Sequence, residues 1–474
     1  MNATIQIVCD AAQAARAMPP YTSRRPHWVL MATVLASSLA FIDGSVVNVG
    51  LSAIGKAFHA DASELQWAIN AYLLPLGSLL LLGGAAGDRF GRPRLLIVGT
   101  ALFGTASTLC ALAPSLAWFL TGRVAQGVGS ALLMPNSLAI LGMTFSGTAR
   151  GRAIGVWASA GAVMGAIAPV LGGWLIDTVG WPAIFFINLP FAAGAIALAI
   201  LFIPDPGPQK NPSSLDWWGG LLATAGLAAL TWGLTVASGR ADWTETSILL
   251  TVAGVALMLG FLLVEASRHE KAMMPLALFR SSSFVGLTLL TFLLYGALGA
   301  LLVLVPYLLI QVGGYSATEA GAALLPFAAV MALASTAFGT IAGRIGPRVP
   351  LFIGALLVAG GFLLLLRVQS RVDYWAEILP SILVIALGMA GAAAPLTVAV
   401  LGSVDSRHTG SASGLNSAVA RTAGMMATAL LGGALGMSGP ALVSGFRLAA
   451  FVCALAAVGA AVCAFFLVSV HARP

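Results

Sequence analysis

The sequence predicts an all-α membrane protein with fourteen transmembrane spans. Of its 474 residues, 59% are apolar and only 8% are charged, whereas soluble domains carry about a quarter charged residues. Fourteen apolar runs of the length that crosses a bilayer follow one another along the chain. Lys and Arg fall mainly in alternate loops between these runs, which is typical of a polytopic membrane protein.

Composition also limits the kinds of site. The formal net charge of +7 forms no basic stripe, because Lys and Arg stand singly or in small groups, so we expect no nucleic-acid partner. The four cysteines form no Cys-x-x-Cys pair and the five histidines form no His-Glu-x-x-His motif. We therefore predict no metal, no cofactor and no enzyme active site.

The apolar runs are bounded by charged residues, Pro or turn clusters. Six runs precede a stretch rich in Pro, Gly and Asn at 204–212, two precede a charged connector, and six more complete the chain. The fourteen expected spans are at about 28–50, 65–87, 95–113, 116–142, 152–176, 183–203, 215–237, 246–266, 284–311, 318–343, 349–367, 375–402, 409–437 and 443–470.

This order of six, two and six spans predicts four regions. They are a cytoplasmic tail at 1–27, an N-terminal six-helix bundle at 28–203, a linker with two additional transmembrane helices at 204–283, and a C-terminal six-helix bundle at 284–474. The tail carries Asp10 and lacks an apolar core before its arginines, so it does not resemble a cleaved signal peptide.

The basic residues predict the orientation. With the N-terminus inside, 16 of the 23 Lys and Arg residues fall on the cytoplasmic side and 5 on the other, while Arg123 and Arg421 lie in or near spans. This asymmetry follows the positive-inside rule and would be scrambled by a miscounted span. We expect a multi-pass protein of the inner (plasma) membrane with both termini cytoplasmic.

The connector after the second span of each half contains the same short pattern. It reads GDRFGRPR at 87–94 and AGRIGPR at 342–348, so Arg-x-Gly recurs between a Gly/Ala-rich helix end and an apolar helix. Secondary transporters are often built from such repeated bundles. We expect two related six-helix halves around a central cavity, with the two extra helices at the periphery.

The first of these connectors, GAAGDRFGRPR at 84–94, carries more than positive charge. Its glycines permit a tight turn and close helix approach, and its aspartate can cap or pair across neighbouring helix ends. A loop that served only to set the membrane orientation would need the arginines, but it would not need the aspartate or the glycine spacing. We interpret the loop as a gate that ties helices together until the halves rock; its residues are Gly84, Asp88, Arg89, Gly91 and Arg92.

Two charged residues fall inside predicted spans of the first half. Arg123, in the fourth span, carries an insertion cost of about 2.5–3.5 kcal/mol, so it either faces the interior with a partner or reaches the outer interface. Asp43 is the only one of the 16 acidic residues well inside a span. A buried carboxylate avoids desolvation either by binding a proton or by forming a permanent ion pair, for example with Arg123. Both residues are candidates for proton coupling.

The fifth span contains a run of small residues, GAVMGAIAPVLGG at 161–173. Small residues three and four positions apart form a smooth face for close helix packing. Pro169 removes one backbone donor and permits a bend.

Polar residues on the predicted spans are candidates for the lining of a substrate cavity. They are Asn48, Asn70, Tyr72, Gln126, Asn136 and Gln311. For any single one, a hydrogen bond between helices is the simpler explanation.

These motifs resemble the major facilitator superfamily, and within it the fourteen-helix drug/proton antiporter branch. The loop at 84–94 fits the superfamily pattern Gly-x-x-x-Asp-Arg-x-Gly-Arg-x-Arg, and RVAQG at 123–127 fits its fourth-helix motif, which is associated with proton transfer. FIDGSVVNV at 41–49 resembles the first-helix motif of the branch. The fifth span, with Gly165, Pro169, Gly172 and Gly173, resembles the antiporter motif, although Ala168 replaces the glycine before the proline.

The resemblance implies the major facilitator fold and proton-coupled efflux of small, drug-like, amphipathic molecules, driven by the proton motive force. Rocking of the bundles would expose the cavity alternately to each side, with Asp43 carrying the proton. A dedicated exporter of an endogenous metabolite or a self-made antibiotic would use the same machinery. A membrane-embedded enzyme would need clustered His, Asp or Glu residues, and a channel would show rings of repeated polar residues.

The expected partners are therefore the lipid bilayer, a small-molecule substrate and protons. The connector before the last span, at about 437–443, leaves little room for an external domain, so use of a periplasmic adaptor is not inferred. Transporters of this architecture can work as monomers, and a monomer is the simplest expectation.

The expected topology predicts a labelling pattern in intact cells. Single cysteines introduced at positions 59, 242 and 373 should react with a membrane-impermeant thiol reagent, because these loops face outward. Cysteines at 92, 210 and 348 should react only after the cells are permeabilised. Labelling of 210 and 373 from the same side would contradict the order of six, two and six spans.

Overall fold

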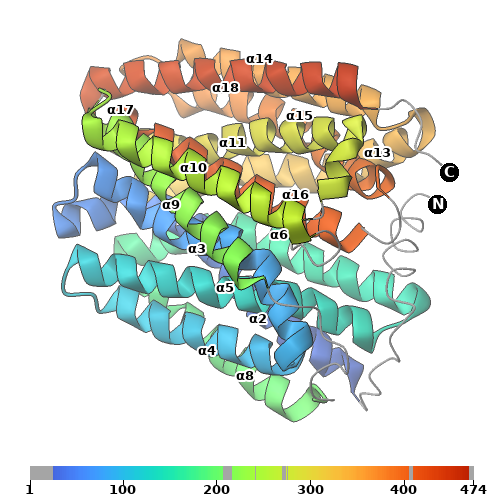
Figure 1. Cartoon of the computed structure of the whole chain (residues 1–474). Coiled ribbons are helices and arrows are strands. Elements are labelled where there is room, and N and C mark those ends of the chain that lie inside the picture. Colours follow the sequence, from blue (N-terminus) through green and yellow to red (C-terminus); the bar gives the residue numbers. More distant parts are fainter. Residues whose placement is uncertain are drawn as a thin grey trace.

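The computed structural model describes residues 25–205, 216–240, 242–268, 274, 276–404 and 409–468, and every regular element within these ranges is a helix. The helices run side by side along one common direction (Figure 1). Most of the predicted N-terminal tail, and Lys210 in the linker, lie outside the described residues.

The first half contains six spans in the described residues, of which the sixth is broken into two helices. They are α2 (Pro26–Phe58), α3 (Ala62–Phe90), α4 (Arg92–Ala111), α5 (Leu116–Thr144), α6 (Gly147–Thr178), and α7 (Ala183–Phe186) with α8 (Asn188–Phe202). α3 packs on α5, α4 packs on α5 and α8, and α2 packs on α6 and α8.

The second half has the same number of described spans, with breaks near the starts of its second and fourth. They are α11 (Ser282–Gln311), α12 (Ala317–Ala322) with α13 (Leu325–Ile345), α14 (Arg348–Leu364), a π-helical turn (Tyr374–Ile378) with α15 (Leu379–Gly402), α16 (Thr409–Leu430) and α18 (Gly439–Leu467). A short helix, α17 (Gly432–Leu435), joins the last two.

The two extra helices, α9 (Trp217–Arg240) and α10 (Glu245–Arg268), lie between the halves at the front of Figure 1. α9 contacts α3 of the first half and α16 of the second. Thr224 on α9 donates a hydrogen bond to Ser78 on α3 (3.0 Å), and Ser238 donates to the Ala429 carbonyl (2.6 Å). α9 therefore bridges the seam between the halves.

Thirteen of the described helical segments are long and apolar enough to cross a membrane. α16, with 22 residues, is the fourteenth span. It is less apolar because it is packed against α3, α9 and α11 and carries polar residues on those contacts. The prediction of fourteen spans is confirmed, although several helices extend beyond their apolar runs; α2 continues to Phe58 and ends at His59, which has a left-handed φ of 52°.

The second span of each half begins with the same local structure. α3 starts with a capping box between Asp61 and Glu64, and α12 starts with one between Ser316 and Glu319. Each such box satisfies backbone N–H groups at a helix start. At the other end of these spans, Gly91 and Gly346 have φ values of 99° and 83°, a region that favours glycine. The Arg-x-Gly pattern of the two connectors therefore corresponds to a shared turn.

The most extensive contacts between the halves are those of α2 with α11, α3 with α16, and α6 with α12. We call the end of the molecule at which α2 begins the near end, and the end at which α2 stops the far end. Beyond α12, few contacts join α6 to α13. In α13, only Ala342 is buried. The halves are therefore joined at the far end of α6 and lie apart toward its near end.

Glycines allow the closest helix contacts inside the first half. A Cβ atom added at Gly129 on α5 would lie 2.7 Å from the carbonyl oxygen of Gly99 on α4, and one added at Gly99 would lie 2.8 Å from the Gly129 carbonyl oxygen. Both distances are shorter than a carbon–oxygen contact allows, and the obstacle is backbone rather than a flexible side chain.

The substitution Gly129→Val should therefore lower the free energy of unfolding by about 1–3 kcal/mol through overpacking. Gly142→Val is the matched control, because Gly142 lies in the same helix and a Cβ atom there would meet nothing within 4 Å. The measurement is the midpoint of thermal unfolding of each purified variant in detergent. Equal midpoints for the two variants would contradict the close approach of α4 and α5.

Candidate functional site

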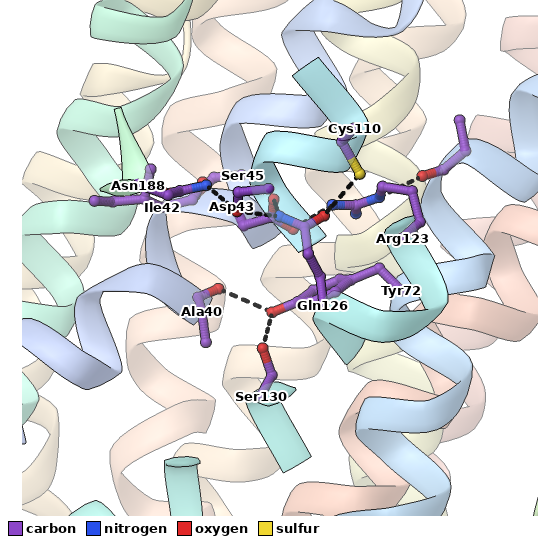
Figure 2. A network of polar contacts seen from close by, with 12 residues as sticks. Ala40, Ile42, Asp43, Ser45, Tyr72, Cys110, Arg123, Gln126, Ser130 and Asn188 are labelled. Carbon is purple, nitrogen blue, oxygen red and sulfur yellow. Dashed lines mark hydrogen bonds and ion pairs between the residues drawn. The ribbon is translucent and has the colours of Figure 1, made fainter. Parts of the chain in front are cut away.

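An ion pair lies fully buried in the middle of the first half (Figure 2). Nη1 of Arg123 on α5 donates a hydrogen bond to Oδ2 of Asp43 on α2, at 2.5 Å, and both side chains are 1% exposed or less. Arg123 thus faces the interior rather than the membrane interface. Burying two charges costs more than their attraction returns, unless other hydrogen bonds satisfy the remaining polar atoms.

Gln126 and a backbone carbonyl supply those bonds. Nε2 of Gln126 donates to Asp43 Oδ1 (3.1 Å), and Oε1 of Gln126 accepts from Arg123 Nη1 (2.9 Å). Nε of Arg123 donates to the carbonyl of Ala68 on α3 (3.0 Å). Gln126 therefore binds both charged partners, one helical turn after Arg123 on the same face of α5.

Two small polar residues extend this network to the other helices of the half. Nε2 of Gln126 donates to the hydroxyl of Ser107 on α4 (2.8 Å), which also accepts from Asn188 Nδ2 on α8 (3.3 Å). The ion pair and its partners thus connect α2, α3, α4, α5 and α8. Neither Ser107 nor Asn188 was singled out from the sequence, because Ser and Asn are common in membrane helices and only their neighbours reveal the role.

Tyr72 on α3 forms one face of the pair. The Arg123 guanidinium lies 4.6 Å from the centroid of its ring, a distance at which a cation is attracted to an aromatic face. The Tyr72 hydroxyl donates to the Ala40 carbonyl (3.3 Å) and lies 3.2 Å from the Ser130 hydroxyl. Arg123 is therefore enclosed by an acid, an amide, a carbonyl and an aromatic ring.

A cavity of about 90 Å³ lies beside the ion pair and between the two halves. Asp43 and Arg123 contribute to its wall, and most of the remaining wall is apolar. Its first-half residues are Asp43, Gly44, Val47, Asn48, Ile69, Tyr72, Leu73 and Arg123; its second-half residues are Gly299, Leu302, Val303, Gly424 and Thr428. The charged pair is thus adjacent to a space that any relative motion of the halves would reshape.

The predicted cavity residues occupy several different places. Asn48 and Tyr72 line the cavity, and Gln126 lies behind it in the ion-pair network. Asn136 donates from α5 to the Gly83 carbonyl on α3 (3.0 Å), and Gln311 donates to Ser52 at the far end (2.7 Å). Asn70 is completely buried, and neither of its amide atoms has a partner in the described part of the chain.

The small residues of the fifth span pack on the other half at the far end. Cβ atoms added at Gly173 and Gly321 would overlap the carbonyl oxygens of Ala317 and Pro169, respectively, so α6 and α12 touch backbone to backbone. Gly172 lies against the Val46 side chain on α2 of the same half, whereas a Cβ atom at Gly165 would meet nothing within 4 Å. Close packing is thus confined to the far part of the motif.

Asp177, at the end of α6, crosses to the same contact. Its carboxylate accepts from the backbone N–H of Ala317 (3.2 Å), from the N–H of Thr318 (2.8 Å) and from the Thr318 hydroxyl (2.5 Å). A carboxylate at the start of a helix is stabilised by the free N–H groups there. An acid of the first half therefore caps a helix of the second half. This role was not predictable from the sequence, because Asp177 stands at a helix end like other acids of the chain.

The predicted gating loop forms the near-end corner between α3 and α4. Asp88 pairs with Arg92 across the corner (2.6 Å), and Arg94 pairs with Asp205 after α8 (2.6 Å). The Arg89 guanidinium lies 5.8 Å from the Phe90 ring. A Cβ atom added at Gly87 would overlap the Asn136 side chain, while Gly84 meets only Pro135, at 3.6 Å. The Asp88–Arg92 pair thus lies within the corner, and the Arg94–Asp205 pair joins the corner to the start of the linker.

Two bundles of membrane helices, with a charged pair in the wall of a cavity between them, define a secondary transporter. The chain belongs to the major facilitator superfamily: the model of that family matches residues 33–428 and 287–474. The fold and family predicted from the sequence are confirmed. Among the described residues, no cluster of His, Cys, Asp and Glu could hold a metal ion.

Relatives with 30% identity or more span most of the chain. The tetracenomycin C resistance and export protein of Streptomyces glaucescens is 31% identical over 409 residues, which are 86% of this chain and 76% of that protein. The multidrug resistance protein Stp of Mycobacterium tuberculosis is 32% identical over 86% of this chain and 75% of its own. The methylenomycin A resistance protein of Bacillus subtilis is 30% identical, and the match covers 80% of this chain and 81% of that protein.

Solved structures agree on the fold. A D-xylose–proton symporter superposes with a TM-score of 0.70 at 16% identity, covering 94% of this chain and 98% of the symporter. A bacterial homologue of the human lysosomal transporter Spinster, in an inward-facing and occupied conformation, superposes with a TM-score of 0.64 at 16% identity, covering 94% and 97%. At this identity the likeness shows the architecture alone.

The cap that Asp177 places on α12 should help to keep the far end closed. Asp177→Ala removes its three hydrogen bonds, so the population with separated far ends should increase. The measurement is the distance distribution between spin labels at the exposed positions Val179 and Trp375. Asp61→Ala is the control, because its capping box lies within the first half. Identical distributions for Asp177→Ala and wild type would rule out the cap as a tie between the halves.

Proposed function

We propose that this protein exports small amphipathic molecules in exchange for protons, by alternating access across the inner (plasma) membrane. The observation that carries this proposal is the Asp43–Arg123 pair in the wall of the central cavity. A carboxylate that touches the cavity can exchange a proton as the surroundings of the cavity change. The family and its drug-resistance relatives support export rather than uptake.

The pair supports a competition between a proton and Arg123 for the Asp43 carboxylate. When Asp43 is ionised, the pair is electrically neutral and both oxygens of the carboxylate accept a hydrogen bond. When Asp43 binds a proton, Arg123 keeps the Ala68 carbonyl and Gln126 Oε1 as acceptors, but the site gains a net positive charge. Substrate in the adjoining cavity would favour one of these two states over the other, which is the requirement for coupling.

The positive-inside distribution of Lys and Arg supports a cytoplasmic near end. On that assignment the conformation is closed toward the outside, by the α6–α12 contact and the Gln311–Ser52 hydrogen bond. Proton entry from the outside would then require the far-end contacts to part. The antiporter motif would serve as the outer seal, with Gly173 permitting the close contact with α12.

A largely apolar cavity with few polar groups fits an amphipathic molecule. Two kinds of physiological role use such a cavity. Multidrug efflux is supported by the relative named a multidrug resistance protein, and secretion of a self-made antibiotic or metabolite is supported by the relative named a tetracenomycin C resistance and export protein. No cofactor is needed in either case, because the proton motive force supplies about 2.3 kcal/mol per charge and 100 mV.

Substitution of Asp43 tests the coupling in reconstituted vesicles. Asp43→Asn mimics a permanently protonated carrier, so accumulation of a neutral dye against its gradient should fall to the level of empty vesicles. Asp43→Glu keeps a titratable group and should retain part of the activity. Transport is driven by an imposed pH gradient. The measured accumulation is divided by the amount of folded protein in the vesicles.

Glu245→Gln is the matched control, because it removes an acid at the exposed start of α10, away from the cavity. Two results would count against the proposal. One is wild-type accumulation by Asp43→Asn. The other is loss of folded protein with normal transport by the remainder, which would assign the pair a purely structural role.

A further inference from the structure

A second arginine lies inside the membrane region, and the coupling mechanism does not use it. Arg421 is near the middle of α16 and half-buried. Its guanidinium forms no hydrogen bond or ion pair within the described residues, whereas Arg123 has four polar contacts. An arginine at membrane depth without a partner is costly, which suggests a functional role.

The register of α16 places Arg421 on the face that lines the cavity. Gly424 and Thr428 line the cavity, and Arg421 precedes them by three and seven residues, so all three share one helix face. On the opposite helix, Gly77 follows the lining residue Leu73 by one turn, and a Cβ atom added there would lie 3.7 Å from Arg421 Cβ. Arg421 therefore enters the seam between α3 and α16 one turn toward the near end of the cavity.

The positive charge of Arg421 also acts on a residue of the cavity wall. Arg421 lies close enough to Tyr72 for the two side chains to interact electrostatically. Tyr72 lines the cavity and also covers the Arg123 guanidinium. Arg421 and Arg123 therefore both act on Tyr72.

An unsatisfied amide lies on the same seam. Asn70 is 0% exposed, and both its amide nitrogen and its amide oxygen lack a partner in the described part of the chain. It precedes Gly77 by seven residues and therefore shares the α3 face that meets α16. A buried amide without partners is unfavourable, so an acceptor that enters the seam would gain its N–H groups.

The charges of the cavity do not balance. Asp43 is neutralised by Arg123 and further satisfied by Gln126, so it offers little attraction to a cation. Arg421 adds a positive charge from the second half with no acidic partner among the described residues. In a site of low dielectric constant, such a charge attracts an anion strongly and repels a cation.

We propose that the substrates of this exporter are amphipathic organic anions whose carboxylate or sulfonate binds Arg421. The apolar part of the molecule occupies the cavity beside Val47, Leu73 and Leu302. Asn70 lies about two helical turns from Gly77 on α3, so it would donate to a polar group on that part of the molecule rather than to the acidic group. This inference rests on the proposed function, since it names the substrate class of the same cavity.

The charge of the substrate changes the energetics of the cycle. Export of a monoanion in exchange for one proton moves two positive charges inward, whereas export of a neutral molecule moves one and export of a monocation moves none. Anion export should therefore depend more steeply on the membrane potential than export of a neutral analogue.

Three probes with the same ring system test the proposal: 2-naphthoic acid carrying a short alkyl chain, its methyl ester, and the corresponding naphthylmethylammonium. Affinity for each is measured on purified full-length protein at neutral pH. Wild type should bind the acid at least about tenfold more tightly than the ester. Arg421→Gln should remove that difference, Arg421→Lys should keep part of it, and the control Arg447→Gln should leave it unchanged, because Arg447 bonds the Val368 carbonyl away from the cavity.

Each outcome decides a separate point. Equal wild-type affinity for acid and ester, or a preference for the ammonium probe, would overturn the proposal without any variant. Equal weakening of acid and ester by Arg421→Gln would assign Arg421 to packing and also overturn it. Export remains testable apart from this, because pH-driven accumulation of the ester by wild type and Arg421→Gln would support the transporter even if the preference for anions were absent.

Discussion

The architecture depends on two opposite charges held where lipid would otherwise surround them. Neither Asp43 nor Arg123 is stable alone at membrane depth, and removing one partner of such a pair costs about 3–5 kcal/mol. Five helices of the first half converge on the pair, so that Gln126 and the Ala68 carbonyl bond its other polar atoms while Ser107 accepts a hydrogen bond from Gln126. The same convergence positions the carboxylate at the cavity wall, as the proposed coupling requires.

Helix contacts without side chains make this convergence possible. Gly99 and Gly129 bring α4 and α5 together around the pair, while Gly173 and Gly321 bring the two halves together at the far end. The first contact is internal to one half and stays intact when the halves move. The second joins the halves and must part, and the Asp177 cap on α12 adds polar contacts that can be broken and re-formed.

The sequence predicted the elements whose signal is local. Apolar runs gave the fourteen spans, and charges inside those runs gave Asp43 and Arg123, because a charge in a membrane helix is rare enough to be informative. The roles of Ser107, Asn188 and Asp177 were not predicted, because each depends on which helix the side chain faces. For the same reason Asn136 and Gln311, predicted for the cavity, instead join helices elsewhere. The sequence placed Arg421 in or near a span. Only the register of α16 against α3 in the structure shows which way it faces.

The central claim is that Asp43 binds or releases a proton when the occupancy of the cavity changes. Proton release on substrate binding is the most direct test of this claim. Purified protein in weakly buffered detergent is mixed with a saturating amount of the neutral naphthoate ester, and the pH change is recorded over a range of starting pH. Wild type should exchange up to about one proton per protein within a limited pH range, and Asp43→Asn, which retains ester binding, should exchange none. The same proton exchange in Asp43→Asn as in wild type would contradict the account.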